Sequence, residues 1–343
     1  MRSFLKPAAG LACVVALAVT GCSPGAGGAA AAAPRGEGGA PGAGPAAGGS
    51  GGTAYAPYVS ATTASAQDSA GSPSAYNLAF VIARGTSCTP AWNGDRAIGD
   101  PAVKARISRL RASGAAVRVS FGGESGTELA AACTGVPALA AAYGRALDAA
   151  GSARADFDVE GGVLSDAASV ARRSEAVARL QRERPSLEVS FTLPVMPDGL
   201  DAGGLALLKS ARSHGVRISA VDIMTMNYGE SYAGDMGGYA LASAQATHAQ
   251  LRKVLGLSDA AAWRAMALTS MIGVNDVKGE TLTLAGAARV REFAVRKKIA
   301  WVSMWATFRD QPCRTGAPEQ HDAATDCSGV AQRPGAFAEA FSG

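Results

Sequence analysis

Short apolar runs alternate with segments of helical periodicity along most of the chain. Each run is nearly continuous in apolar residues, which is typical of strands buried on both faces. The predicted strands are Ala54–Val59, Tyr76–Ala83, Ala116–Phe121, Ala155–Glu160, Leu187–Leu193, Ala220–Met226, Ala265–Ile272 and Ile299–Trp305. Segments with apolar residues at helical spacing lie between several of them: Asp100–Ser113, Val136–Ala150, Asp166–Glu183 and Thr283–Lys297.

This alternation predicts an α/β fold with a parallel sheet, because each helix returns the chain to the start of the next strand. Eight such units in a single domain favour a closed (β/α)8 TIM barrel. An open, doubly wound sheet is the structural alternative. It commonly has fewer strands, and no Gly-x-Gly-x-x-Gly follows the first predicted strand.

The N-terminus has the pattern of an export signal, predicted over residues 1–21. Arg2 and Lys6 precede an apolar run, Ala8–Val19, that is too short for an ordinary membrane-spanning helix. The run ends in Val19-Thr20-Gly21-Cys22, which resembles a bacterial lipobox, so lipidation of Cys22 is expected. A conventional secretory signal with a chance cysteine is the alternative.

Residues 22–53 are rich in Gly, Ala and Pro and have almost nothing to bury, which predicts a flexible tether. Residues 54–343 then form the folded domain. The expected location is outside the cell, with a lipid anchor on the outer face of a bacterial membrane and no spanning segment.

Cysteine usage agrees with export. Cys13 lies in the apolar signal and Cys22 at its end, which leaves an even number in the domain and suggests two disulfides. Three connectivities are possible, and we favour Cys88–Cys133 with Cys313–Cys327. None of these cysteines has the spacing of a metal site and the three histidines are isolated from them, so no metal or other cofactor is expected.

The chain has 32 Lys and Arg residues against 28 Asp and Glu, a formal net charge of +4. The basic residues form no long block, so no nucleic-acid partner is expected.

The most informative stretch is Asp156-Phe157-Asp158-Val159-Glu160. Side chains alternate along a strand, so the three carboxylates point one way and the two apolar side chains the other. Three carboxylates in one buried row repel one another, and the pKa of at least one should be raised. Stability alone would not place them there, so the row predicts a catalytic site.

The row also allows two simpler interpretations. The row could be the acidic face of a solvated edge strand. It also imitates the start of an EF-hand calcium loop, but Ala167 stands where the bidentate Glu would be needed, and Phe157 and Val159 suit a strand better than a loop.

The row resembles the Asp-x-x-Asp-x-Asp-x-Glu signature of glycoside hydrolase family 18, the chitinase family with a (β/α)8 barrel. Ser120-Phe121-Gly122-Gly123 is similar to its Ser-x-Gly-Gly element, and Met226-Asn227-Tyr228 to its Met-x-Tyr element. Trp305 stands where the family places a Trp beneath the sugar. Each motif lies at the C-terminal end of a predicted strand, where barrel active sites lie.

The resemblance implies a retaining, substrate-assisted mechanism in which the 2-acetamido oxygen of the substrate is the nucleophile. Glu160 would be the general acid, Asp158 would hold the acetamido N–H, and Asp156 would share a proton with Asp158. Tyr228 would hydrogen-bond the acetamido carbonyl, and Trp305 would stack on the sugar. The implied substrate-binding residues are Ser120, Gly122, Gly123, Met226, Asn227 and Trp305.

The chain departs from the family pattern at several positions. Ala153 replaces the first Asp of the signature, and Gly229 stands where an Asp often follows the Tyr. Asn227 precedes the Tyr, and Phe308 after the last strand could crowd or floor the site.

The expected function is therefore hydrolysis of chitin or a related N-acetylglucosamine polysaccharide by a monomeric enzyme. One alternative is an endo-β-N-acetylglucosaminidase acting on N-linked glycans, which the same residues would serve. Another is a catalytically silent carbohydrate-binding protein on the same barrel, although silent relatives typically lose the Glu. Four tryptophans are few for a long cleft: Trp92, Trp263, Trp301 and Trp305.

Overall fold

The computed structural model describes residues 52–314 and 326–343. The predicted signal, Cys22 and nearly all of the predicted tether lie outside the described residues. Among the residues described, no helix combines the length and apolar character needed to cross a membrane.

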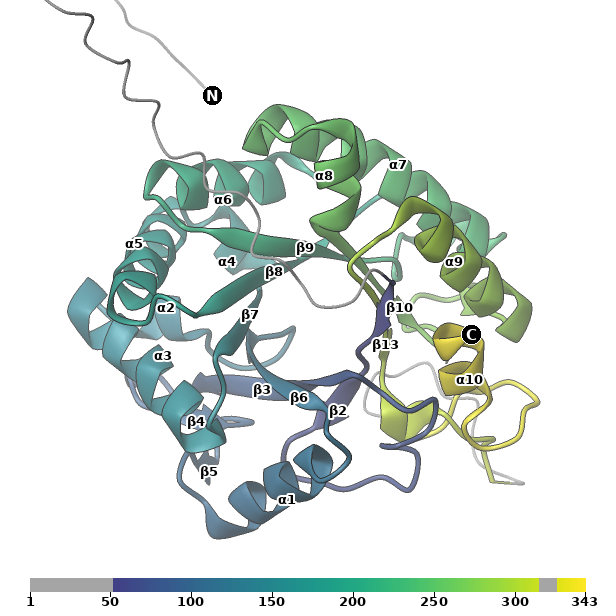
Figure 1. Ribbon diagram of the computed structural model, residues 1–343, viewed down its shortest axis with the longest axis horizontal. Helices are drawn as coiled ribbons and strands as arrows, with labels where there is room; N and C mark the ends of the chain where they lie inside the picture. The colour runs from purple at the N-terminus through teal and green to yellow at the C-terminus, as the bar shows by residue number, and fades with distance from the viewer. Residues whose placement is uncertain (1–51, 315–325) are drawn as a thin grey trace, which may run out of the picture. The chain divides into compact units, whose positions relative to one another are not determined.

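A closed ring of parallel strands forms the centre of the described domain (Figure 1). The first strand is split into β1 and β2. β1 pairs with the last barrel strand, β13, and β2 pairs with β3, so the ring closes. The predicted (β/α)8 barrel is therefore confirmed. The barrel strands are β1 (Ala54–Tyr55), β2 (Tyr58–Ser60), β3 (Ala75–Ala83), β6 (Ala116–Gly122), β7 (Arg154–Asp158), β8 (Glu188–Pro194), β9 (Ile218–Met224), β10 (Met266–Met271) and β13 (Trp301–Trp305).

The sequence predicted one continuous first strand, and this detail was wrong. Pro57 interrupts it, because proline has no backbone N–H to donate to a neighbouring strand. Before Pro57, Ala54 is in register with Trp301 of β13; after it, Tyr58 is in register with Asn77 of β3. Each half thus bonds to a different neighbour, and the interruption lies where the barrel closes.

Helices surround the ring, and the four predicted from periodicity are present (Figure 1). Several begin at a side chain that accepts a hydrogen bond from the backbone of the first turn, such as Asp100, Asp166 and Thr283. The helices are α1 (Pro101–Arg111), α2 (Leu129–Ala132), α3 (Val136–Ala150), α4 (Gly162–Ser165), α5 (Ala167–Glu183), α6 (Ala202–Ser213), α7 (Met236–Leu255), α8 (Asp259–Arg264), α9 (Leu284–Lys297) and α10 (Ala336–Ser342).

The main apolar core lies between the ring and these helices. Phe121 of β6 stacks on Phe157 of β7 with ring centroids 5.3 Å apart, and Tyr143 of α3 packs edge-on against both. Because side chains alternate along a strand, Phe157 faces this core while its neighbours Asp156 and Asp158 face the inside of the barrel. The outer packing therefore fixes the direction in which the carboxylates point.

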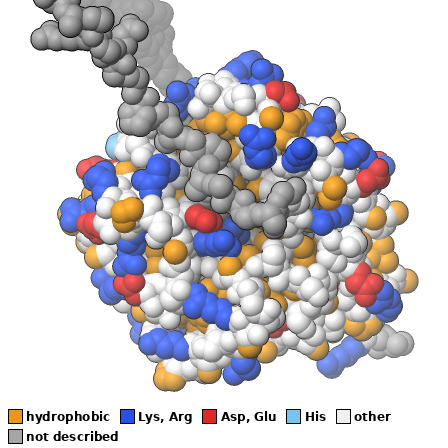
Figure 2. All heavy atoms as spheres, in the orientation of Figure 1, with side chains coloured by type: hydrophobic (Ala, Val, Ile, Leu, Met, Phe, Trp, Pro, Cys, Tyr) orange, Lys and Arg blue, Asp and Glu red, His pale blue; other side chains and the backbone are white. Residues whose placement is uncertain are grey.

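Both expected disulfides are present. Cys88, in the loop after β3, is bonded to Cys133 at the end of α2, and Cys313 is bonded to Cys327. Short additional elements extend the loops: β4 (Pro90–Trp92), β5 (Arg96–Ala97), β11 (Gly273–Val274), β12 (Thr281–Leu282) and the 3-10 turns η1 (Glu230–Tyr232) and η2 (Thr307–Arg309). On the face shown in Figure 2, basic side chains are interspersed with acidic and uncharged ones.

Candidate active site

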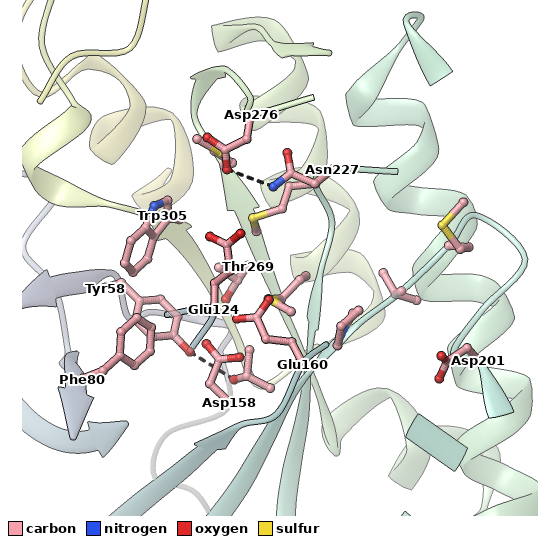
Figure 3. A pocket seen from close by; sticks show the side chains of 17 residues that line it. Tyr58, Phe80, Glu124, Asp158, Glu160, Asp201, Asn227, Thr269, Asp276 and Trp305 are labelled. Carbon is pink, nitrogen blue, oxygen red and sulfur yellow. Dashed lines mark hydrogen bonds between the residues drawn. The ribbon is translucent and has the colours of Figure 1, made fainter. Parts of the chain in front are cut away.

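A cavity of about 440 Å3 opens where the barrel strands end (Figure 3). It extends from Trp305 and Phe80 on one side to Asp201 on the other, with Asp158 and Glu160 between them. The carboxyl ends of parallel strands meet at this edge, which is where barrel enzymes carry their catalytic groups. The lining residues are Tyr58, Phe80, Glu124, Asp158, Glu160, Thr192, Pro194, Val195, Met196, Asp201, Met224, Met226, Asn227, Thr269, Met271, Asp276 and Trp305.

Asp156 is the deepest member of the carboxylate row and does not line the cavity. It is 1% exposed and accepts hydrogen bonds from four hydroxyl groups. These bonds hold the Asp156 carboxyl group in one position below the cavity. The donors are Tyr58 at 3.1 Å, Ser120 at 2.7 Å, Ser190 at 2.6 Å and Thr192 at 3.0 Å.

Asp158, the last residue of β7, lies at the floor of the cavity and is 4% exposed. Its Oδ1 atom has no hydrogen-bond partner among the described residues. Burial raises the pKa of Asp158 well above its usual range, and the charges of Glu160 and Asp156 raise it further. The expected carboxyl group of high pKa in the row is therefore present.

Glu160 follows β7 by two residues and reaches into the cavity (Figure 3). The predicted strand therefore ended two residues too late, but Glu160 still lines the same cavity as Asp158. Burial, and next the charge of Glu124, raise the pKa of Glu160 to about 7. A carboxyl group with this pKa is protonated in a large fraction of molecules at neutral pH, as a general acid requires.

Aromatic rings form one wall of the cavity. Trp305 lies nearly parallel to Phe80 with ring centroids 5.5 Å apart, and Tyr58 contacts both rings. Phe308 packs edge-on against Trp305 and does not line the cavity, so it is not a floor of the site. It therefore supports the Trp305 ring from behind.

The turn after β6 is built on Gly122 and Gly123, which both have positive φ values. A Cβ atom on Gly122 would lie 2.0 Å from the Asp158 carbonyl oxygen, and one on Gly123 would lie 2.9 Å from the Phe80 ring. Only glycine allows this close approach to β7 and to the aromatic wall. Ser120 does not line the cavity but donates a hydrogen bond to Asp156 below it.

The turn after β9 differs from the prediction. Met226 and Asn227 line the cavity, but Tyr228 does not. Asn227 has a φ of +54°, and after it the chain directs the Tyr228 side chain outward, where its hydroxyl accepts a hydrogen bond from Ser243 of α7 at 3.2 Å. The expectation that Tyr228 would reach the substrate is therefore not supported by this geometry.

Comparisons with known proteins agree with the motifs. A probable bifunctional chitinase/lysozyme of Escherichia coli (strain K12) is 34% identical over 287 residues, which are 78% of this chain and 32% of that protein. Endochitinase 11 of Metarhizium anisopliae is 32% identical over 278 residues, which are 75% of this chain and 52% of that protein. No protein-family model matches the chain.

Solved structures extend the comparison. Active domain 2 of the Pyrococcus furiosus chitinase superposes with a TM-score of 0.73 at 27% identity, over 84% of this chain and 93% of that one. The chain belongs to glycoside hydrolase family 18 and is chitinase-like. A family 18 chitinase from Pseudoalteromonas aurantia, at 14% identity and a TM-score of 0.54, shares the fold, covering 74% of this chain and 94% of that one. The chain spans about a third and about half of the two curated relatives.

The structure shows the surroundings of two departures from the family 18 pattern. Gly229 replaces an Asp, and its backbone N–H donates to Glu280 at 2.8 Å, so a carboxylate from another loop lies against this turn. Ala153, in place of the first Asp, precedes β7 and does not line the cavity.

Sequence reasoning missed several lining residues. Some come from loops without periodic pattern, and Phe80 comes from β3, whose apolar pattern does not mark any of its residues as part of a site. Glu124 directly follows the family 18 Gly-Gly turn and could have been found there. Asp276 lies between β11 and β12 and accepts a hydrogen bond from the Asn227 side chain at 3.1 Å. No signal in the sequence connects Asp201, Phe80 or Asp276 with the carboxylate row.

Proposed function

We propose that the protein hydrolyses β-1,4 bonds between N-acetylglucosamine units of chitin or its oligosaccharides, with retention of configuration at the anomeric carbon. The observation that carries this proposal is the pair of carboxyl groups at the cavity floor. Glu160 has a pKa near neutrality, and Asp158 is buried beside it with an unpartnered oxygen. Trp305 and Phe80 provide the apolar surface that a sugar ring needs.

In the first step, Glu160 transfers its proton to the oxygen of the bond that breaks. The 2-acetamido oxygen of the same substrate attacks the anomeric carbon as that oxygen leaves with the bonding electrons, which gives a cyclic oxazolinium ion. Asp158 lies where it can accept a hydrogen bond from the acetamido N–H and balance the positive charge. The charge of Asp156, which lies below Asp158, opposes ionisation of Asp158 until the positive charge of the oxazolinium ion develops.

In the second step, the Glu160 carboxylate takes a proton from water as the water oxygen attacks the anomeric carbon. The ring of the oxazolinium ion opens, the acetamido group is restored, and Glu160 regains its proton. Two displacements at one carbon retain its configuration.

Asn227 is the group that we assign to the acetamido carbonyl in place of Tyr228. A side-chain amide carries two N–H donors, and one of them points to Asp276. Asn227 lines the cavity, so its second N–H is available to a carbonyl oxygen there.

The printed names of the relatives support this substrate class. Both curated relatives are named as chitinases, and the Pyrococcus furiosus domain has been solved with chito-oligosaccharides.

The test is incubation of the full chain with chitin oligosaccharides, with products followed by mass. Wild type should release shorter oligosaccharides, and Glu160→Gln should lower kcat by about 10²–10⁴-fold, since it cannot donate the proton. The matched control is Glu175→Gln, which removes the same charge from the exposed side of α5 and should cleave at the wild-type rate.

Binding of oligosaccharides without cleavage would contradict the proposal and favour a silent carbohydrate-binding protein. Cleavage of N-linked glycans with no cleavage of chitin oligosaccharides would favour an endo-β-N-acetylglucosaminidase.

We also propose that the protein is exported and anchored by lipid on Cys22, on the strength of the lipobox-like Val19-Thr20-Gly21-Cys22. Metabolic labelling with a fatty acid should label wild type, and Cys22→Ala should remove the label. Labelling that persists in Cys22→Ala would contradict a lipid on this residue.

A further inference from the structure

Glu124 is the cavity residue that the proposed mechanism leaves without a part. It immediately follows Gly122-Gly123, and both its side chain and that of Glu160 point into the cavity (Figure 3). It is exposed, and its carboxylate has no hydrogen-bond or ion-pair partner within residues 52–314 and 326–343.

The backbone holds Glu124 close to Glu160. The Gly123 N–H donates to the Asp158 carbonyl oxygen at 3.1 Å, which joins the turn to the strand that precedes Glu160. A side chain on Gly122 would collide with that same carbonyl group, so the two segments are in direct contact.

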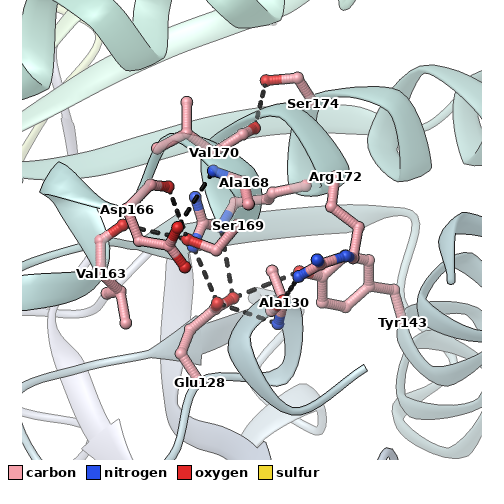
Figure 4. A network of polar contacts seen from close by, with 11 residues as sticks. Glu128, Ala130, Tyr143, Val163, Asp166, Ala168, Ser169, Val170, Arg172 and Ser174 are labelled. Atoms are coloured by element: carbon pink, nitrogen blue, oxygen red, sulfur yellow. Dashed lines mark hydrogen bonds and ion pairs between the residues drawn. The ribbon is translucent and has the colours of Figure 1, made fainter. Parts of the chain in front are cut away.

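The other end of this turn is fixed by a buried ion pair (Figure 4). Glu128 caps α2 by accepting a hydrogen bond from the Ala130 N–H, and it pairs with Arg173 of α5 at 2.8 Å. Tyr143 of α3 donates to the same carboxylate at 3.3 Å. Glu124 therefore lies on a short segment that is anchored on both sides.

The acidic groups around Glu160 come from four directions. Asp158 lies below it on β7 and shares a hydrogen bond with it, which lowers the pKa of Glu160. Glu124 approaches from the turn after β6 and raises that pKa, whereas Asp201 and Asp276 lie elsewhere on the cavity wall. The lining contains no Lys, Arg or His to offset these charges.

We propose that Glu124 is a positioning residue whose negative charge keeps the proton on Glu160 until the glycosidic bond is in place. The role rests on the proposed function, since a general acid that has lost its proton cannot begin the reaction. Repulsion between two nearby carboxylates makes the ionised form of Glu160 less favourable. Glu124 need not touch the reacting atoms.

The direct test is an NMR titration of the full chain labelled with ¹³C at the glutamate carboxyl groups, with the Glu160 signal assigned by Glu160→Gln. In Glu124→Gln, the titration midpoint of Glu160 should fall by about half a pH unit, from the energy of an exposed charge pair. Glu124→Asp, which restores the charge, should return the midpoint most of the way. Glu175→Gln, with the same loss of charge on α5, should leave it in place.

The rate profile gives the second measurement. Because Glu160 acts while protonated, the decline of kcat/KM at high pH should move to lower pH in Glu124→Gln by the same amount. High salt screens exposed charges, so it should lower the Glu160 midpoint in wild type more than in Glu124→Gln.

The outcomes separate the two proposals. A lowered midpoint in a protein that cleaves no chitin oligosaccharide would support the role of Glu124 in setting the protonation of Glu160 and overturn the proposed function. Cleavage with an unmoved midpoint in Glu124→Gln, and no effect of salt on wild type, would overturn the role of Glu124. A changed KM with an unmoved midpoint would show that Glu124 instead contacts the sugar.

Discussion

Asp222 of β9 is a buried acid below the cavity, and its titration should make the stability of the barrel depend on pH. It is 1% exposed, and its Oδ2 atom accepts hydrogen bonds from Thr269 at 2.8 Å and from the Trp301 indole at 3.2 Å. Its Oδ1 atom has no partner among the described residues. Burial, and then the charge of Asp156, raise the pKa of Asp222 from 3.8 to about 7.

A raised pKa in the folded state means that the folded chain binds this proton more tightly than the unfolded chain does. The resulting stabilisation is complete below pH 3.8 and is lost as the pH rises to about 7. Each pH unit in that window is worth about 1.4 kcal/mol, so ionisation of Asp222 costs about 4 kcal/mol by pH 8. Of this, about 2–3 kcal/mol is lost between pH 5 and pH 8.

Asp222→Asn removes the titration and keeps an oxygen that can accept both hydrogen bonds. The amide N–H groups that replace Oδ1 will lack partners, and this penalty is the same at every pH. Urea denaturation should therefore show that the variant gains about 2–3 kcal/mol relative to wild type between pH 5 and pH 8. An equal difference between the two proteins at both pH values would refute the assignment of a raised pKa to Asp222.

Three further predictions follow from the site and its support. Asn227→Ala should lower kcat/KM for chitin oligosaccharides by about 10-fold or more. Tyr228→Phe should change kcat/KM by less than about 3-fold, because the Tyr228 hydroxyl faces α7. A larger loss in Tyr228→Phe than in Asn227→Ala, measured by steady-state kinetics, would disprove the assignment of Asn227 to the acetamido carbonyl. Trp305→Ala should raise KM by roughly 10-fold through loss of stacking, and an unchanged KM would argue against a sugar at this wall. Arg173→Met leaves the Glu128 carboxylate buried without its ion-pair partner, so the free energy of unfolding measured in urea should fall by about 3–5 kcal/mol. A fall below about 1 kcal/mol would contradict the burial of this pair.

The barrel and the carboxylate row could be predicted from the sequence because both rest on periodic patterns. Buried strands are apolar runs, and alternation within one run is enough to place Asp156 and Asp158 on the face opposite Phe157. For the disulfides, the sequence left three connectivities open, and the favoured one is present.

The rest of the cavity depends on turns whose course no periodicity describes. The left-handed conformation at Asn227 decides that Tyr228 points toward α7, and the residue types alone did not reveal this. Phe80 of β3 and Asp276 of the loop between β11 and β12 reach the cavity only because the barrel brings distant segments to one edge. Pro57 could have indicated the break in the first strand, since proline cannot complete a ladder in a central strand.

The central claim is that a neighbouring acetamido group, held between Asp158 and Asn227, attacks the anomeric carbon that Glu160 activates. The most direct measurement is ¹H NMR of the reducing-end anomer formed in the first minutes of chitin oligosaccharide cleavage, before mutarotation mixes the two forms. The account predicts that the β-anomer is formed first, because two displacements retain the configuration. Initial formation of the α-anomer would mean a single displacement by water and would contradict the account.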